Sequence, residues 1–270
     1  MTRPSARIIS RECSAIATIA YRDFTKLLRD RPRMLAGLIF PVLFIGVLGT
    51  SLNAAIGHDI GFDFLAFVFT GVFAQVLFQS SAAGVMSLIE DRENDFSQEL
   101  FIAPVSRYSI IFGKILGETL VSYAAGVGVL LFGLIIGVPF TSLQLLLVIL
   151  AGFAACFLGG AFGVLVLANL SSQRTVAQVF PLILFPQIFL AGVFNPIDKL
   201  PLVLAFLSRA TPLTYVVDLV RNAYYGATPS GAMARAVAFS PLVDITVIGV
   251  LFFVFLVFGT MLFIRREQNR

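Results

Sequence analysis

Charged side chains are scarce in this chain of 270 residues. Asp, Glu, Lys and Arg make up 13% of it and hydrophobic residues 58%, whereas soluble domains carry about 25% charged residues. This composition excludes a soluble globular protein and indicates an integral membrane protein. Tryptophan is absent, so only tyrosine is left to form an aromatic belt at the membrane surface. The 28 Phe residues suit helix packing and lipid contact.

Cysteine and histidine are also nearly missing. Cys13 lies in the polar N-terminal segment and Cys156 in the middle of an apolar run, so we expect them at different depths and predict two free thiols without a disulfide. The single histidine, His58, has only Asp59 and Asp63 near it, which is not a metal-ligand pattern. We therefore expect no metal site and place His58 in a solvated loop.

Six apolar runs are present, and about 20 such residues cross a membrane as a helix. They are 34–55, 64–89, two runs between 115 and 174 that separate at a turn around Pro139, 176–194 with Pro181 and Pro186, and 245–264. The predicted fold class is an all-α polytopic membrane protein. One transmembrane domain covers residues 1–270, and the prolines of the fifth run predict a kink.

Lys and Arg gather on one side of this predicted bundle. The N-terminal segment, the loop after the second helix, the link after the fourth and the tail hold 15 of the 19. Since basic residues mark cytoplasmic segments, both termini and the 90–107 loop are predicted to be cytoplasmic, in a bacterial cytoplasmic membrane. The net charge of +4 follows from this topology and does not indicate nucleic-acid binding.

The segment 1–33 is predicted to form an amphipathic entry helix. Apolar residues recur at spacings of three and four between 8 and 31, with charged residues on the other face and Pro32 at the end. This pattern favours a helix in the cytoplasmic headgroup plane, in contact with membrane lipid. The alternative is a solvated helix that docks on another subunit.

The segment 195–240 is predicted to be an extracytoplasmic re-entrant segment between helices five and six. Its apolar pieces, 202–207 and 212–225, are too short to cross the bilayer, which indicates half-helices that dip into the outer leaflet. The alternative is an amphipathic hairpin on the surface.

Five acids crowd the beginning of the 90–107 loop: Glu90, Asp91, Glu93, Asp95 and Glu99. Phe96, Glu99 and Leu100 stand at i, i+3 and i+4, so a short helix would present them as one ridge that stops near Pro104. Such a helix fits a groove on a cytoplasmic partner. The alternative is a solvated loop without a partner.

These residues also carry a resemblance. EDRE at 90–93, EL at 99–100, APVSR at 103–107 and GK at 113–114, followed by NP at 195–196, LP at 200–201, PL at 212–213 and DLVR at 218–221, resemble the ABC-2 membrane family. The likeness is to its permeases for daunorubicin-type antibiotics and nodulation factors, and it extends over nearly the whole chain.

The resemblance implies a coupling helix that sits in a cleft of a separate ATPase subunit. The residues that carry over are Glu93, Phe96, Glu99, Leu100, Pro104 and Arg107. Asp95 stands where the family often has glycine, so the turn there departs from the family pattern. The chain has no GxxxxGK[ST] phosphate loop, which implies that it binds no cofactor itself and that two partner ATPases bind ATP and Mg. A second permease, identical or paralogous, completes the expected assembly.

Helices two and five are expected to line the substrate path of such a pair. Their amide and aromatic residues are Phe69, Phe73, Gln75, Gln79, Gln178, Gln187 and Phe189, a combination that suits large amphipathic compounds. The alternative for each is ordinary helix packing. Glu118 is the ionisable residue inside a span, and we expect it to pair with Lys114 one turn earlier; a proton relay is the alternative.

The function that these features favour is the permease subunit of an exporter for lipophilic or amphipathic compounds, such as an antibiotic, a drug or a lipid. The alternative within transport is export of a polysaccharide or a lipid-linked glycan, for which a path without Trp is poorly suited. A membrane enzyme that modifies lipids is the alternative of another class. It would need acids grouped with His or a metal-diphosphate site, so we predict that the chain is not an enzyme.

Overall fold

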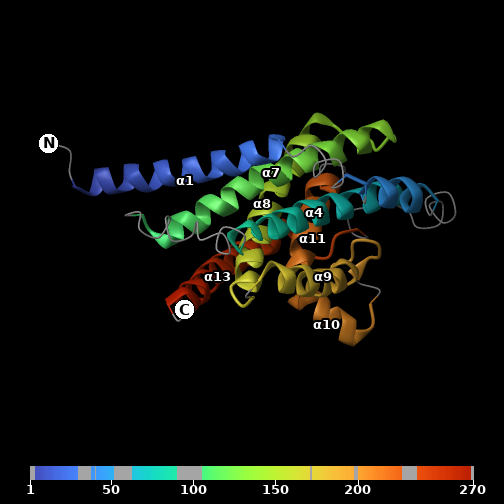
Figure 1. Cartoon of the computed structure of the whole chain (residues 1–270). Coiled ribbons are helices and arrows are strands. Elements are labelled where there is room, and N and C mark those ends of the chain that lie inside the picture. Colours follow the sequence, from blue (N-terminus) through green and yellow to red (C-terminus); the bar gives the residue numbers. More distant parts are fainter. Residues whose placement is uncertain are drawn as a thin grey trace.

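The computed structural model describes residues 4–29, 38–39, 41–51, 63–89, 105–170, 172–197, 200–226 and 236–268. Within these ranges the chain is helical and contains no strand. The elements are α1 (Pro4–Arg29), η1 (Phe44–Gly49, a π-helix), α4 (Phe64–Gly84), α7 (Arg107–Ile135), α8 (Ser142–Leu167), α9 (Gln173–Leu190), α10 (Leu202–Ala210), α11 (Pro212–Tyr225) and α13 (Pro241–Gln268). Figure 1 shows them as one elongated bundle.

Four helical segments of the described chain are long and apolar enough to cross a membrane: Phe64–Ile89, Arg107–Ile135, Ser142–Leu167 and Pro241–Arg265. The α10 and α11 pair, bent by 86° at its break, makes a fifth if it counts as one span. The all-helical membrane fold is therefore confirmed. The predicted number of six spans is not confirmed. The first run lies partly outside the described residues. Helix α9 begins with polar residues, and its mean hydropathy is too low for it to count among these spans.

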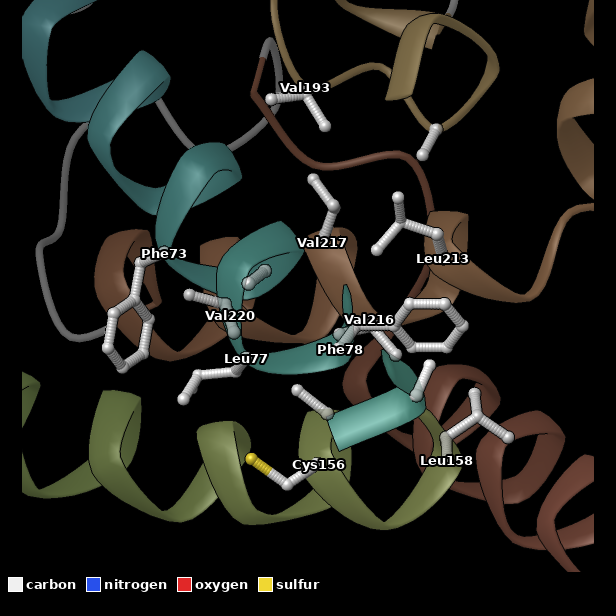
Figure 2. Close-up of a cluster of buried hydrophobic side chains, with 14 of the residues drawn as sticks. Phe73, Leu77, Phe78, Cys156, Leu158, Val193, Leu213, Val216, Val217 and Val220 are labelled. Carbon is white, nitrogen blue, oxygen red and sulfur yellow. The ribbon is translucent and has the colours of Figure 1, made fainter. Parts of the chain in front are cut away.

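Helix α4 is the centre of the bundle. Within its most apolar stretch 83% of the residues are buried inside the chain, compared with 22% in that of α13. Figure 2 shows Phe73, Leu77 and Phe78 of α4 in a cluster with Cys156 of α8 and Val217 of α11. A helix that is apolar on every side needs neighbours on every side, and α4 therefore contacts α7, α8 and α11. Because α13 is largely exposed, most of its apolar surface is available to lipid.

Glycines allow α8 to lie directly against the backbone of α4. A Cβ at Gly159 would stand 2.2 Å from the carbonyl oxygen of Phe78, and one at Gly163 would stand 2.5 Å from that of Ala82. Small residues at such contacts are typical of membrane helix pairs, since van der Waals packing drives their association. The backbones of α4 and α8 are therefore in direct contact at these glycines.

The turn predicted around Pro139 is confirmed. α7 ends at Ile135, Gly137 follows with a φ of 89°, and Thr141 caps α8 together with Gln144 in a capping box. The positive φ is one that glycine adopts without strain. This tight connection makes α7 and α8 antiparallel neighbours.

The predicted entry helix is present as α1, which lies alongside the first half of α7 (Figure 1). Gly113 and Gly117 of α7 face Ile16 and Ala20 of α1, and a Cβ on either glycine would stand 3.1 Å from the Cα of its counterpart. Part of the apolar face of α1 is therefore covered by α7. The placement of α1 in the headgroup plane stays a prediction.

Candidate functional site

The first candidate site is a group of polar contacts that we call the loop junction, where α1 and the end of α4 meet the start of α7. Its centre is an ion pair between Lys114 Nζ and Asp23 Oδ2, 3.0 Å apart. Both side chains are at most 3% exposed. Removal of either partner of a buried ion pair destabilises the fold strongly, because the other charge stays buried without compensation. The pair therefore fixes α1 to α7.

Ser87 and Ser106, which lie on either side of residues 90–104, both form hydrogen bonds at this junction. On the α7 side, the Ser106 backbone N–H donates to the Glu12 carboxylate, at 3.1 and 3.0 Å to its two oxygens. On the α4 side, the Ser87 hydroxyl donates to the Gly84 carbonyl at 2.6 Å and is shared with Glu118 Oε1 at 3.3 Å. The residues on both sides of the segment therefore contact α1 and α7.

Lys114 also has a partner outside its own helix. Its ammonium group forms an ion pair with Asp23, which is 91 positions earlier in the chain. Glu118 is 4% exposed and lies 3.3 Å from Ser87 Oγ, and its expected pairing with Lys114 stays a prediction. Sequence spacing did not find Asp23, because α1 and α7 meet only in the tertiary structure. Both charged residues are visible in the sequence, but nothing in it shows that Asp23 and Lys114 are partners, because they are far apart in the chain.

Most of the residues expected to couple to an ATPase lie outside the described part of the chain: Glu93, Phe96, Glu99, Leu100 and Pro104. Arg107 is described and forms the first residue of α7, directly after Ser106 of the loop junction. The role of these six residues stays a prediction.

The predicted path residues of α4 lie inside the chain. Phe69 and Phe73 are 0% exposed and Gln75 is 1% exposed. Phe69 packs edge-to-face on Phe140, with ring centroids 5.5 Å apart, and Gln75 Nε2 donates to Gln79 Oε1 over 3.2 Å. Within one copy of the chain these side chains therefore fill the core of the bundle.

The predicted path residues of α9 are divided between two faces. Gln178 is exposed and Phe189 is 57% exposed, whereas Gln187 is 7% exposed and donates to the Ile183 carbonyl. Phe185 is 61% exposed and contacts Phe189 edge-to-face. The structure thus does not bring the α4 and α9 residues to one surface of the single chain, and their place in a substrate path stays a prediction.

A second polar site lies at the other end of the bundle, and we call it the α11 cluster: Asp218, Arg221, Asn222 and Asp244. Arg221 is 1% exposed. Its Nη2 donates to the carbonyls of Gly192 and Val193 at 2.8 and 3.1 Å, and its guanidinium lies 3.5 Å from the Phe67 ring centroid. It thus joins α11 to α4 and to the turn after α9.

The acidic members of the α11 cluster bind the segment that leads into α13. The Asp218 oxygens accept the backbone N–H groups of Ala238 and Phe239, each at 2.8 Å. Asn222 Nδ2 donates to the Phe239 carbonyl at 3.1 Å and to Asp244 Oδ2 at 2.8 Å. Our sequence analysis quoted Asp218 and Arg221 only as part of a resemblance. The sequence pattern could have indicated a buried polar cluster, because Asp, Arg and Asn stand at i, i+3 and i+4 in an otherwise apolar helix.

Further contacts of α11 explain why this end is compact. Tyr224 Oη donates to the Pro139 carbonyl at 2.7 Å, and Tyr225 Oη donates to that of Asp63 at 3.3 Å. Gln144 Nε2 donates to the Tyr224 carbonyl at 2.9 Å. Each bond ties α11 to the end of another helix, so α11 organises the end of the bundle that is remote from the 90–104 segment. Neither site groups three metal-ligating side chains among the described residues.

Comparison with known proteins identifies the family. The family model described as ABC-2 type transporter matches residues 14–225. A transport permease, ycf38, of Cyanophora paradoxa is 26% identical over 207 residues, which cover 75% of this chain and 71% of that protein. Nodulation protein J of Rhizobium leguminosarum bv. trifolii is 24% identical over 196 residues, 72% of this chain and 74% of the relative, and that of Rhizobium meliloti is 23% identical over 196 residues, with the same two shares. This chain belongs to the ABC-2 type transporter family.

Proposed function

We propose that the chain is the permease subunit of an ATP-driven exporter, and that its 90–104 segment couples it to a separate ATPase. The supporting observation is the loop junction. The segment leaves α4 beside Ser87 and enters α7 at Ser106, and both residues are hydrogen-bonded to buried or partly buried carboxylates. A segment without a mechanical role does not require such attachments at both ends.

In the proposed mechanism, two ATPase subunits bind ATP and Mg and move toward each other, each carrying the coupling segment of one permease. The second permease is a copy or a paralogue of this chain. The movement displaces α7 together with α1 through the Asp23–Lys114 pair. A permease pair with two packing arrangements would then change from inward-facing to outward-facing, as alternating access requires.

The proposed substrates are lipophilic or amphipathic compounds that leave the cytoplasm of a bacterial cell. The exposed face of α9 supports this class, since Leu182, Phe185 and Phe189 are 57–74% exposed and the amide of Gln178 lies on the same helix. Aromatic surface with few hydrogen-bonding groups suits such ligands. The inside position of both termini and of the coupling segment rests on the distribution of Lys and Arg in the sequence.

The test of this function is the double substitution Phe96→Ala and Glu99→Lys, which removes the apolar contact and reverses the charge of the expected coupling ridge. Export measured in inverted vesicles, and stimulation of the co-expressed ATPase by the permease, should both be lost while the amount of inserted protein is unchanged. The matched control carries Phe253→Ala and Glu267→Lys in α13 and should export normally. Export that persists in the loop variant would contradict the coupling role.

A further inference from the structure

Asp244, in the first turn of α13, is in an unusual setting for a carboxyl group. Its side chain is fully buried. Oδ2 accepts one hydrogen bond, from the neutral amide of Asn222, and Oδ1 has no hydrogen-bond partner. No Lys or Arg among the described residues forms an ion pair with it. A buried carboxylate with one donor and no cation is strongly disfavoured over its neutral form.

A second acid, Asp218, lies beside Asp244. The two side chains are close enough to hydrogen-bond to each other. Both Asp218 oxygens already accept backbone N–H groups, from Ala238 and Phe239, and such bonds hold a carboxyl group in its ionised form. Two carboxylates in contact cannot both stay ionised in a buried site, as in the acid pairs that share one proton. One of the two must be neutral, and the backbone bonds favour ionised Asp218.

The unpaired atoms of the cluster indicate where the proton goes. Asn222 Oδ1 is a buried acceptor without a partner in the described chain, as is Asp244 Oδ1. An O–H on Asp244 supplies the donor that the surrounding oxygens lack. We propose that the α11 cluster is a proton-binding site, in which Asp244 takes one proton from solvent and donates a hydrogen bond to Asp218 or Asn222.

The other titratable groups near the pair do not replace this proton. Arg221 of α11 lies near Asp218, but its Nη2 is bonded to the carbonyls of Gly192 and Val193. Tyr215 faces Asp244 and donates its hydroxyl to the Arg209 carbonyl. On the α4 side, Asp63 interacts with Tyr225, whose hydroxyl donates to the Asp63 carbonyl. On the α8 side, Gln144 is uncharged and donates to the Tyr224 carbonyl.

Proton binding at this site joins α13 to α11. With Asp244 neutral, the chain of hydrogen bonds from Asp218 through Phe239 and Asn222 to Asp244 is closed. Loss of the proton puts a second negative charge against Asp218 and repels the first turn of α13. The site does not depend on the proposed export function, and a failure of the export test above would leave it intact.

The first experiment measures the proton directly in the purified full-length chain, by infrared spectroscopy of the carbonyl stretch of protonated carboxyl groups at neutral pH. The difference spectrum between the wild type and Asp244→Asn should contain one such band. The control is Asp63→Asn, the same change at an exposed helix cap where asparagine also caps, and its difference spectrum should lack the band. If the difference spectrum between the wild type and Asp244→Asn lacks the band, the proposal is overturned.

The second experiment follows thermal unfolding in detergent from mildly acidic to mildly alkaline buffer. A proton bound in the folded state stabilises at low pH and its contribution is lost as the pH rises, so the midpoint of the wild type should fall with rising pH. Asp244→Asn, which mimics the neutral side chain, should remove this fall, and Asp63→Asn should keep it. Equal pH dependence in the wild type and Asp244→Asn would contradict proton binding.

A monovalent cation is the competing occupant of the site. Unfolding is therefore repeated with sodium replaced by choline at constant ionic strength. The proposal expects the same midpoint in both salts. A wild type stabilised by sodium, with Asp244→Asn insensitive to it, would overturn the proton assignment in favour of a sodium site.

Discussion

The two polar sites of this chain are built differently. At the loop junction, side chains on separate helices meet each other: Asp23 of α1 pairs with Lys114 of α7, and Ser87 binds Glu118. There a bond to backbone joins Glu12 to Ser106. In the α11 cluster most bonds go to backbone: Arg221 binds two carbonyls and Asp218 binds two N–H groups, and one bond joins the side chains of Asn222 and Asp244. Side-chain contacts between helices can rearrange without breaking a backbone bond, whereas the cluster holds irregular backbone in place.

This difference suggests a division of labour along the bundle. In the mechanism proposed above, the loop junction would transmit displacement of the 90–104 segment, and the α11 cluster would be the anchor against which the helices move. A break such as the 86° bend between α10 and α11 leaves carbonyls that the helices do not pair. There the hydroxyls of Thr211, Thr214 and Tyr215 donate to the last carbonyls of α10. The following substitutions test each end, from the largest expected effect to the smallest.

Arg221→Met should have the largest effect on stability. It removes the bonds to Gly192 and Val193 and the contact with Phe67, and it leaves two buried carbonyls without donors. Loss of one member of a buried charged network costs about 3–5 kcal/mol, and we expect the upper part of this range. The measurement is the midpoint of unfolding in detergent. The matched control, Arg209→Met at an exposed position of α10, should unfold as the wild type does; an equal midpoint for Arg221→Met would disprove the anchor.

Lys114→Met should rank second, because it leaves the buried Asp23 with only the partly exposed Arg22 as its cation. The expected loss is about 3 kcal/mol. The double variant Asp23→Leu with Lys114→Met removes both charges and should recover most of that stability, while export stays impaired because the charged link between α1 and α7 is gone. A double variant as unstable as the single one would show that the pair is not the source of the effect.

Gly117→Val should separate α1 from α7 at the loop junction. The added Cβ would stand 3.1 Å from Ala20 Cα, and overpacking of this kind costs about 1–3 kcal/mol. Gly249→Val in α13 is the control, since its Cβ would meet no atom within 4 Å. Cross-linking of cysteines placed on α1 and α7 reports the separation directly. Unchanged cross-linking in Gly117→Val would count against the close contact.

Glu12→Gln should have the smallest effect on stability. It keeps an acceptor for the Ser106 N–H and removes only the negative charge, so we expect a loss of about 1 kcal/mol or less. The informative measurement is the ratio of export to ATP hydrolysis. This ratio should fall, because the hydrogen bond between Glu12 and Ser106 is weaker without the negative charge. A ratio equal to that of the wild type would show that the Glu12–Ser106 contact has no part in coupling.

Local sequence patterns were sufficient for several helices of this fold, although α7 begins at Arg107 and not near Ile115. The continuous apolar run of α4, the turn near Pro139 and the short helices that begin near Leu202 and Pro212 were all predicted close to their positions. Each depends on residues a few positions apart: a hydrophobic period, a glycine with positive φ or a proline at the first turn of a helix.

The polar sites could not be predicted in the same way. Asp23 and Lys114 are far apart in sequence, and the bonds of Arg221 go to backbone of another segment. Burial of Phe69, Phe73 and Gln75 inside one chain also depends on how α7 and α8 pack on α4. Sequence patterns identify which helix faces are apolar, but partners across the bundle are decided by packing that no local spacing encodes.

The opposite positions of the two ends can be tested with single cysteines in a background in which Cys13 and Cys156 are replaced by serine and alanine. Glu99→Cys marks the 90–104 segment and Ser240→Cys marks the α11 cluster end, and each is treated with a membrane-impermeant maleimide in intact cells and in inverted vesicles. The account predicts that position 99 reacts only in inverted vesicles and position 240 only in intact cells. Reaction of position 99 in intact cells would contradict it.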